Sequence, residues 1–232
     1  MKKRNLLAIV FCAATIQSSY AQFIVKPDFM ETTGVSNDGL VVGYEAQSGP
    51  YSIWDADAGT TNLIGGMAPG LGVGGQARFS DDGNFISGTS HVVAGSEMSR
   101  YDVVANSWSP LGSFGFAVDS SLSGGFNISG DGNTVVGNSW ADTAGGFFYT
   151  HAVAWNQIEG FMDLGSLFAA SGRSTRANAV SGDGSVIVGW QDFNGPWKSA
   201  VWRKNPSGGY YPNEYLLIDT NGNPNDEFNQ LG

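Results

Sequence analysis

Short runs of hydrophobic residues alternate with polar ones along most of this chain, and turns rich in glycine, aspartate and asparagine separate the runs. Runs of this kind, enriched in β-branched and aromatic residues, predict β-strands. After Ile16 no stretch shows the period of an amphipathic helix. With 34 glycines and 8 prolines among 232 residues, the pattern predicts an all-β protein whose short strands are joined by tight turns.

One motif, Ser-x-Asp-Gly followed by a short apolar run and a further glycine, occurs four times. From serine to serine the copies lie 44, 49 and 52 residues apart, and a period of this length indicates an array of small repeated units. Glycine adopts positive φ without steric cost, while aspartate and serine side chains bond to nearby backbone groups, so these residues are predicted to build turns rather than to catalyse. The turn residues are Ser36, Asp38, Gly39, Ser80, Asp82, Gly83, Ser129, Asp131, Gly132, Ser181, Asp183 and Gly184.

Two further landmarks follow each turn. The second strand is expected to end at the motif glycine, as at Gly189, and a third strand ends in an aromatic residue before a fourth ends in Leu-Gly or Ile-Gly. Four strands per unit is the count of a β-propeller blade, so the chain is predicted to be a propeller-like array of four-stranded antiparallel blades. The repeat aromatics, predicted to pack blade against blade, are Trp54, Tyr101, Trp155 and Trp202.

These residues resemble a known group of repeats. The repeated Ser-x-Asp-Gly-x-x-Val-x-Gly, with Ala-x-x-Trp and Leu-Gly after it, resembles the bacterial extracellular repeats of the HAF type. It is similar, more loosely, to the Ser-x-Asp-Gly hairpins of WD-repeat and TolB-like propellers. The resemblance covers nearly the whole mature chain and implies a β-propeller at a secreted or cell-surface location. It implies no catalytic residues, because the HAF type has no agreed activity.

The first 21 residues have the composition of a cleavable signal peptide. A basic start is followed by an apolar run that is too short to span a bilayer, and small residues precede a predicted cleavage after Ala21. The expected organisation is therefore a signal peptide over residues 1–21 and a repeat domain over residues 22–232, with the mature protein secreted or at the cell surface.

The end of the chain suggests an incomplete ring. In earlier units the next motif serine follows 15 to 17 residues after Ile-Gly or Leu-Gly, so Leu231-Gly232 is expected to be the stub of a further unit. Either a small ring is closed by the strand around Phe23-Ile24-Val25, or the chain is an open arc of a longer protein. The stub favours the open arc.

Charge and cysteine content exclude several classes of function. Removing residues 1–21 takes away three basic residues and no acid, which moves the formal charge from −10 to −13. An acidic surface repels phosphate backbones, so no nucleic-acid partner is expected. The one cysteine, Cys12, lies in the predicted signal peptide, so the mature chain has no disulfide or thiolate chemistry.

No set of residues predicts a cofactor. His91 and His151 share no ligand spacing with acids, which leaves zinc chemistry without support. One segment has oxygen-bearing side chains at alternate positions, as calcium loops do, and is a weak calcium candidate. A solvated loop is the simpler interpretation, because Pro224 and Gln230 stand where a calcium loop of the EF type has Gly and Glu. The candidate ligands are Asp219, Asn221, Asn223 and Asn225.

The first functional hypothesis is an exported binding or adhesion module without catalysis, whose partner is a protein or glycan at the cell surface. The alternative is a propeller-type hydrolase acting on polysaccharide or peptide, and two carboxyl groups converging in a central pocket would favour it. Aromatic residues in the connections could bind a partner or pack between blades. The acids that could serve a hydrolase are Asp102, Asp119, Asp142 and Asp192.

Overall fold

A computed structural model of the chain describes residues 31–44, 50–67, 75–141, 149–165, 174–192, 197–211 and 215–217. Within these residues the regular structure is entirely β, and it forms four antiparallel sheets of four strands, which we call blades 1 to 4 in chain order. Blade 1 contains β1 (Glu31–Val35), β2 (Leu40–Tyr44), β3 (Tyr51–Asp55) and β4 (Thr60–Gly65). Blade 2 contains β5 (Arg78–Phe79), β6 (Phe85–Val92), β7 (Gly95–Asp102) and β8 (Ser107–Gly112). Blade 3 contains β9 (Ser123–Ile128), β10 (Thr134–Ala141), β11 (Tyr149–Asn156) and β12 (Gly160–Gly165). Blade 4 contains β13 (Thr175–Val180), β14 (Val186–Asp192), β15 (Trp197–Arg203) and β16 (Tyr215–Leu217).

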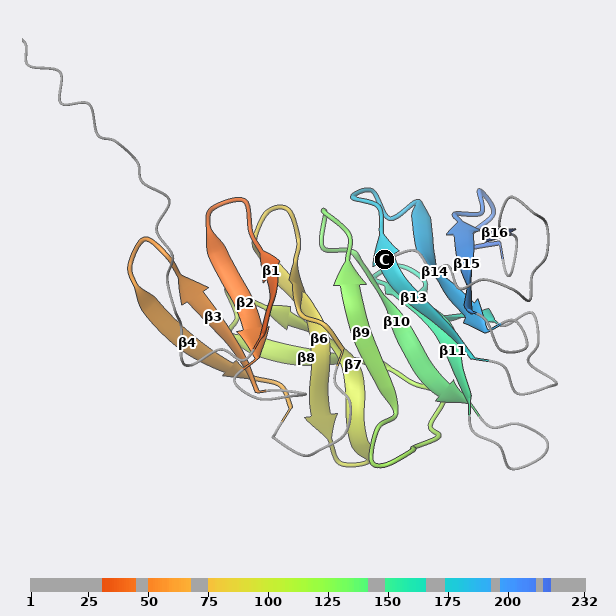
Figure 1. The fold of residues 1–232 in the computed structure, drawn as a ribbon, viewed down its shortest axis with the longest axis horizontal. Coiled ribbons are helices and arrows are strands. Elements are labelled where there is room, and N and C mark those ends of the chain that lie inside the picture. The colour runs from red at the N-terminus through yellow and green to blue at the C-terminus, as the bar shows by residue number, and fades with distance from the viewer. Residues whose placement is uncertain are drawn as a thin grey trace, which may run out of the picture.

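The blades stand side by side in the order of the sequence, from blade 1 at one end to blade 4 at the other (Figure 1). Strand order within each blade follows the chain, and the first strands β1, β5, β9 and β13 contact one another in succession. The predicted fold class, an all-β propeller-like array of four-stranded blades, is confirmed. Over the described residues the ring is not closed, because blades 1 and 4 lie at opposite ends of the row.

The first strand of a blade carries a β-bulge in blades 1, 3 and 4. The extra residue is Thr33, Phe126 or Asn178, in each case three residues before the motif serine. A bulge leaves one residue unpaired and re-aims its side chain. In these three blades one side chain is therefore turned out of the regular alternation at the same place in the first strand.

The motif glycine of the second strand is explained by this bulged neighbour. A Cβ placed on Gly137 would lie 1.9 Å from the carbonyl oxygen of Gly124, and a Cβ on Gly189 would lie 1.9 Å from that of Arg176. Real Cβ atoms do not approach backbone so closely, so glycine is the residue that permits the two strands to meet here.

One expectation about these glycines is wrong. The second strand does not end at the motif glycine: β10 continues from Gly137 to Ala141, and β14 continues from Gly189 to Asp192. The ladder to the third strand is unbroken across both glycines, because the close approach lies on the side of the first strand. In blade 4 the fourth strand is Tyr215–Leu217, while Leu231-Gly232 lies outside the described residues.

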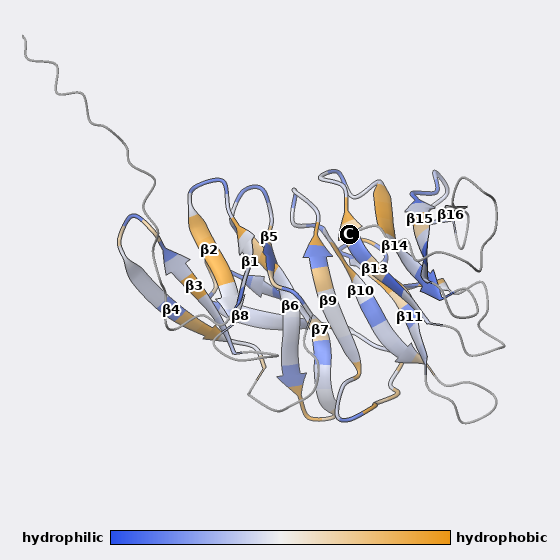
Figure 2. Ribbon diagram, viewed as in Figure 1, coloured by the Kyte–Doolittle hydropathy of each residue, from blue (hydrophilic) through white to orange (hydrophobic). Residues whose placement is uncertain are grey.

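The hydrophobic core lies between blades rather than within one sheet. Three clusters of buried side chains span blades 1 and 2, blades 2 and 3, and blades 3 and 4. In the last cluster Val136 and Leu164 of blade 3 pack with Ile187 and Trp202 of blade 4. Figure 2 shows hydrophobic stretches of β2 and β14 that adjoin hydrophilic turns at one end of the blades. Each blade therefore buries its apolar residues against its neighbour.

The four repeat aromatics occupy one position in the blade. Each stands opposite an apolar residue near the start of the second strand, in the pairs Val41–Trp54, Ile86–Tyr101, Val135–Trp155 and Ile187–Trp202. Tyr101 and Trp202 are buried, whereas Trp54 and Trp155 are half-buried.

Blade 2 has tyrosine where the others have tryptophan, and a neighbouring side chain supplies the missing contact. In blade 4 the indole N–H of Trp202 donates to the carbonyl of Leu164 in blade 3, at 3.1 Å. In blade 2 the indole N–H of Trp108 donates to the carbonyl of Ile64 in blade 1, at 2.7 Å. Trp108 lies directly opposite Tyr101 in the ladder between β7 and β8. Leu164 and Ile64 are equivalent residues, each next to the glycine that ends its blade. Their carbonyls are thus bonded from different strands of the next blade, the third strand in blade 4 and the fourth strand in blade 2.

The glycine contact makes a first prediction. We expect Gly189→Ala to lower the free energy of unfolding by at least about 2 kcal/mol, because overpacking forces the backbone to move. Gly182→Ala is the control, since among the described residues its new Cβ would have Asp81 Oδ2 as its nearest neighbour, at 3.7 Å. Urea unfolding of both variants measures the difference, and equal losses would contradict the explanation.

The buried repeat aromatic makes a second prediction. Trp202 is 1% exposed, so Trp202→Ala should lower the free energy of unfolding by about 3 to 5 kcal/mol. Trp202→Phe should cost less, because it retains ring packing and loses mainly the donor to Leu164, a contact worth about 1 to 3 kcal/mol. Val104→Ala at an 84% exposed position is the control and should leave stability unchanged. A loss for Trp202→Phe as large as that for Trp202→Ala would contradict this account.

Candidate functional site

The Ser-x-Asp-Gly turns join the first and second strands of every blade and share one set of hydrogen bonds. In blade 4 the Ser181 hydroxyl donates to Asp183 at 2.6 Å and accepts from the backbone N–H of Val186 at 3.0 Å. The backbone N–H of Gly184, which has a φ of 71°, donates to the carbonyl of Ser181 at 2.9 Å. The equivalent serine–aspartate contacts are Ser36–Asp38, Ser80–Asp82 and Ser129–Asp131.

Successive turns are also bonded to one another. The Asn37 side chain donates to the carbonyl of Asp81 at 2.7 Å, and the N–H of Asp81 donates to the carbonyl of Gly130 at 2.8 Å. The N–H of Asp131 in turn donates to the carbonyl of Gly182 at 3.3 Å. A line of hydrogen bonds therefore runs across the four blades at the turn end and fixes the position of each first strand.

A cleft of about 720 Å³ lies at this end between blades 3 and 4 and contains three carboxylates, Asp131, Glu159 and Asp183. The Glu159 carboxylate accepts from Lys204, from the backbone N–H of Gly209 at 2.5 Å and from Asn156. These bonds, the Lys204 bond above all, lower the pKa of Glu159 to about 2. The acids of this cleft are therefore engaged in holding turns and blades together.

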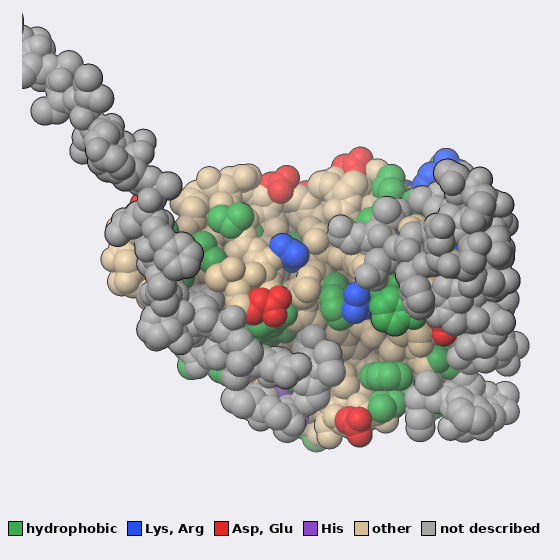
Figure 3. Space-filling model, in the orientation of Figure 1, with side chains coloured by type: hydrophobic (Ala, Val, Ile, Leu, Met, Phe, Trp, Pro, Cys, Tyr) green, Lys and Arg blue, Asp and Glu red, His purple; other side chains and the backbone are tan. Residues whose placement is uncertain are grey.

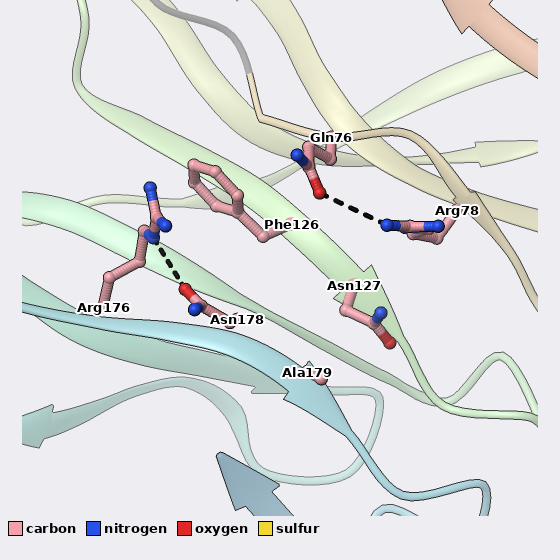
Figure 4. Close-up of a pocket in the computed structure, with 7 residues that line it drawn as sticks. All are labelled: Gln76, Arg78, Phe126, Asn127, Arg176, Asn178 and Ala179. Atoms are coloured by element: carbon pink, nitrogen blue, oxygen red, sulfur yellow. Dashed lines mark hydrogen bonds between the residues drawn. The ribbon is translucent and has the colours of Figure 1, made fainter. Parts of the chain in front are cut away.

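A second cavity, of about 370 Å³, opens along the first strands of blades 2, 3 and 4. Figure 3 shows basic, acidic and hydrophobic side chains near one another on this face of the molecule. Figure 4 shows an arginine and an amide on each side of the cavity, with Phe126 between them. The lining residues are Gln76, Arg78, Phe126, Asn127, Arg176, Asn178 and Ala179. Of the described residues, no acid lines it.

The bulges and the motif glycines shape this cavity. Phe126 and Asn178 are the extra residues of the bulges in β9 and β13. Arg176 contributes the carbonyl that approaches Gly189 most closely. The same local geometry that forces glycine into the second strand therefore presents these side chains along the first strands.

Arg176 is held in place without being neutralised. It is half-buried, its Nε donates to Asn178 Oδ1 at 2.7 Å, and its guanidinium carbon lies 4.6 Å from the centre of the Phe126 ring. Burial lowers the pKa of Arg176, although an arginine remains charged at neutral pH. An amide oxygen and an aromatic face orient a guanidinium but carry no opposite charge.

On the other side, Arg78 is exposed and has a long contact of 3.5 Å to Gln76 Oε1. Among the described residues, ion pairs join His151 to Asp163 and Lys204 to Glu159, and neither pair includes a cavity arginine. Glu31 is an acid of the same neighbourhood, since both it and Arg78 act on the pKa of Tyr44. Burial is nevertheless the largest cause that raises the pKa of Tyr44, to about 12.

The other predicted residues lie elsewhere. Asp102 ends β7, Asp119 lies in the loop before β9 and Asp192 ends β14, and none of them lines the cavity. Outside the described residues lie the predicted signal peptide over residues 1–21, Asp142, and the calcium candidates Asp219, Asn221, Asn223 and Asn225.

Two features are absent from the described ranges. No helix there is long and apolar enough to cross a membrane. No three His, Cys, Asp or Glu side chains of that part of the chain gather as metal ligands would.

The cavity arginines were not among the residues singled out from the sequence. Each lies on a first strand before a motif serine, at residue 78 before Ser80 and residue 176 before Ser181. The motif itself gives no signal there, because the repeats differ in this segment. A comparison of the residues just before each serine would have revealed two arginines and three amides in a chain with a formal charge of −10.

Neither a protein-family model nor a curated protein matches the chain. Among solved structures it is similar to TolB from Acinetobacter baumannii, with 19% identity and a TM-score of 0.50, over 76% of this chain and 41% of that one. A prolyl endopeptidase matches with 11% identity and a TM-score of 0.48, over 78% of this chain and 28% of that one. A chain of a nidogen–laminin complex matches with 11% identity and a TM-score of 0.48, over 86% and 68%.

At 19% identity, the likeness to TolB shows a shared fold and no more. The propeller-like fold is therefore supported both by the blades themselves and by the likeness to TolB. The chain spans about two fifths of the TolB chain that it matches. The HAF-type resemblance stays a prediction.

The turn geometry makes a prediction about acid stability. Hydrogen bonds from Ser181 and Ser185 lower the pKa of Asp183 to about 2, against about 3.9 in an unfolded chain. A lowered folded pKa gives stability that is complete above the unfolded value and is lost as the pH falls through the folded value. Asp183→Asn should therefore lower the thermal midpoint at neutral pH, and its difference from wild type should shrink from about pH 4 to about pH 2.

Thermal unfolding followed by circular dichroism over this pH range measures the effect. Asp57→Asn, at an exposed position in the turn between β3 and β4, is the control and should follow the wild-type curve. A difference between Asp183→Asn and wild type that stays constant down to about pH 2 would contradict the assigned cause.

Proposed function

We propose that this protein is an exported binding module that holds its ligand in the cavity along the first strands and performs no chemistry of its own. The observation that carries the proposal is the lining of that cavity, in which two arginines face a space without a described acid. Export is proposed from residues 1–21, which have the composition of a signal peptide.

An unneutralised, half-buried guanidinium supports binding for an energetic reason. Charged groups removed from water are normally paired, because desolvation otherwise costs free energy. Arg176 has contacts to an amide and to the rings of Phe126 and Trp190. These contacts hold its position and leave its charge available, as a site preorganised for an anionic ligand requires.

The turn residues repeat from blade to blade, whereas the residues of the first strands vary. The turn residues are the same in all four blades, whereas the residue three before each motif serine is Thr33, Ala77, Phe126 or Asn178. A scaffold that repeats while one face varies is the usual arrangement of binding proteins built from repeats. This contrast supports a specific surface along the first strands.

The hydrolase alternative gains no support from the described acids. Those of the turn cleft are bonded to serine, lysine or backbone groups, as Glu159 and Asp183 are. Glycoside hydrolysis needs two carboxyl groups on either side of a bound substrate, and the cavity along the first strands is lined by guanidinium, amide and aromatic groups. The binding module is therefore the better supported function.

Site-specific photo-crosslinking tests the proposal. A benzophenone amino acid at Asn127, which lines the cavity, should form a covalent adduct in the producing cells, detected as a mass increase of the intact protein. The control has the benzophenone amino acid at Val104, which is 84% exposed on the turn after β7. It should not form the adduct that is seen at position 127. The absence of an adduct specific to position 127 would overturn the proposed site, and a mature protein that begins before Gln22 would overturn the predicted cleavage.

A further inference from the structure

We propose that the cavity along the first strands recognises a carboxylate carried by a peptide chain, with Arg176 as the principal anchor and Arg78 as a second cation. This inference deepens the proposed binding function and rests on it. It names the chemistry of the ligand: one carboxylate group, from an acidic side chain or from a chain terminus, next to peptide groups.

The guanidinium of Arg176 is prepared for a planar anion. Its Nε donates to Asn178 at 2.7 Å, and its guanidinium carbon lies over the Phe126 ring, 4.6 Å from the ring centre. With one nitrogen fixed, rotation of the fork is restricted and the two terminal nitrogens remain as a parallel pair of donors. Two parallel N–H donors match the two oxygens of a carboxylate, which is the strongest contact that arginine makes with a small anion.

Arg78 adds a second positive charge from the neighbouring blade. It lies on the opposite side of Phe126 from Arg176 in the cavity (Figure 4), and its contact to Gln76 is to a neutral amide. Within the described part of the chain neither arginine is paired with a carboxylate. Two like charges on one cavity raise the local potential, so the site attracts an anion against the negative charge of the whole chain.

The remaining lining groups favour peptide over sugar. Gln76 and Asn127 each present an amide, which donates and accepts as a peptide group does. A sugar would need an open aromatic face to stack on. The guanidinium of Arg176 covers one face of Phe126, and Trp190 is stacked on Trp197 with ring centres 4.5 Å apart. A volume of about 370 Å³ is near the lower end for ligand sites, so it suits a short segment of chain.

Arginine side-chain resonances test the proposal directly. The full mature protein, labelled with ¹⁵N in arginine, is titrated with synthetic peptide pools while the Nε–H signal of Arg176 is followed. One pool has a central glutamate and an amidated end, a second has no acid and a free carboxyl end, and a third has glutamine and an amidated end. We expect one of the first two pools to shift the Arg176 signal saturably and the third not to.

The responding pool identifies the source of the carboxylate, as a side chain or as a chain end. Equal binding of the third pool, or binding of none, would overturn the carboxylate proposal. A specific adduct at position 127 would then still support the binding module, so the two proposals fail separately. Tighter binding of an oligogalacturonate than of any peptide pool would overturn the choice of a peptide ligand.

Matched arginine variants locate the contact. Arg176→Lys keeps the charge but loses the planar fork, and it should weaken binding of the responding pool at least about tenfold. Arg78→Lys, at an exposed position, should weaken it less. The control is Arg100→Lys, because Arg100 also lies over aromatic rings, Phe85 and Trp155, but outside the cavity. Affinities that are the same for all three variants and wild type would overturn the assignment.

Discussion

The structure depends on one close approach of two backbones inside the blade. In blades 3 and 4 a carbonyl of the first strand, that of Gly124 or Arg176, lies two residues before the bulged residue. It occupies the space that a Cβ on the second strand would need, and the second strand has glycine there, Gly137 or Gly189. The approach lets the bulge form without breaking the ladder to the third strand. Because the bulge sets the direction of the first strand, it also sets how that strand lies against the next blade.

The line of hydrogen bonds between turns acts together with this approach. It ties the residues just after each motif serine across neighbouring blades, while the bulge lies three residues before the serine. In blades 3 and 4 the first strand is therefore held on both sides of the serine by backbone contacts that do not depend on its side chains. Its side chains are then free to differ between blades, which is how a repeat can carry a specific cavity.

The extent to which sequence predicts this protein follows the range of each interaction. Turn chemistry and the spacing of strands are local, so the four-stranded unit and the propeller-like array could be predicted from four copies of one motif. The continuation of β14 past Gly189 could not, because a glycine that ends a strand and one that meets a bulge look alike in the sequence. The contact of Trp108 with Ile64 was hidden for a related reason: it depends on which strand of the next blade reaches that carbonyl.

The cavity was hidden because its residues are brought together from three blades. Arg78 and Arg176 are about a hundred residues apart in a chain where most charges are acidic, and only the succession of first strands brings them to one face. Over long distances the net negative charge repels an acidic ligand, while within a Debye length of roughly 10 Å the two guanidinium groups attract it. Such a site selects against highly charged polyanions and favours a ligand that presents a single carboxylate among neutral groups, which is the form in which a peptide offers one.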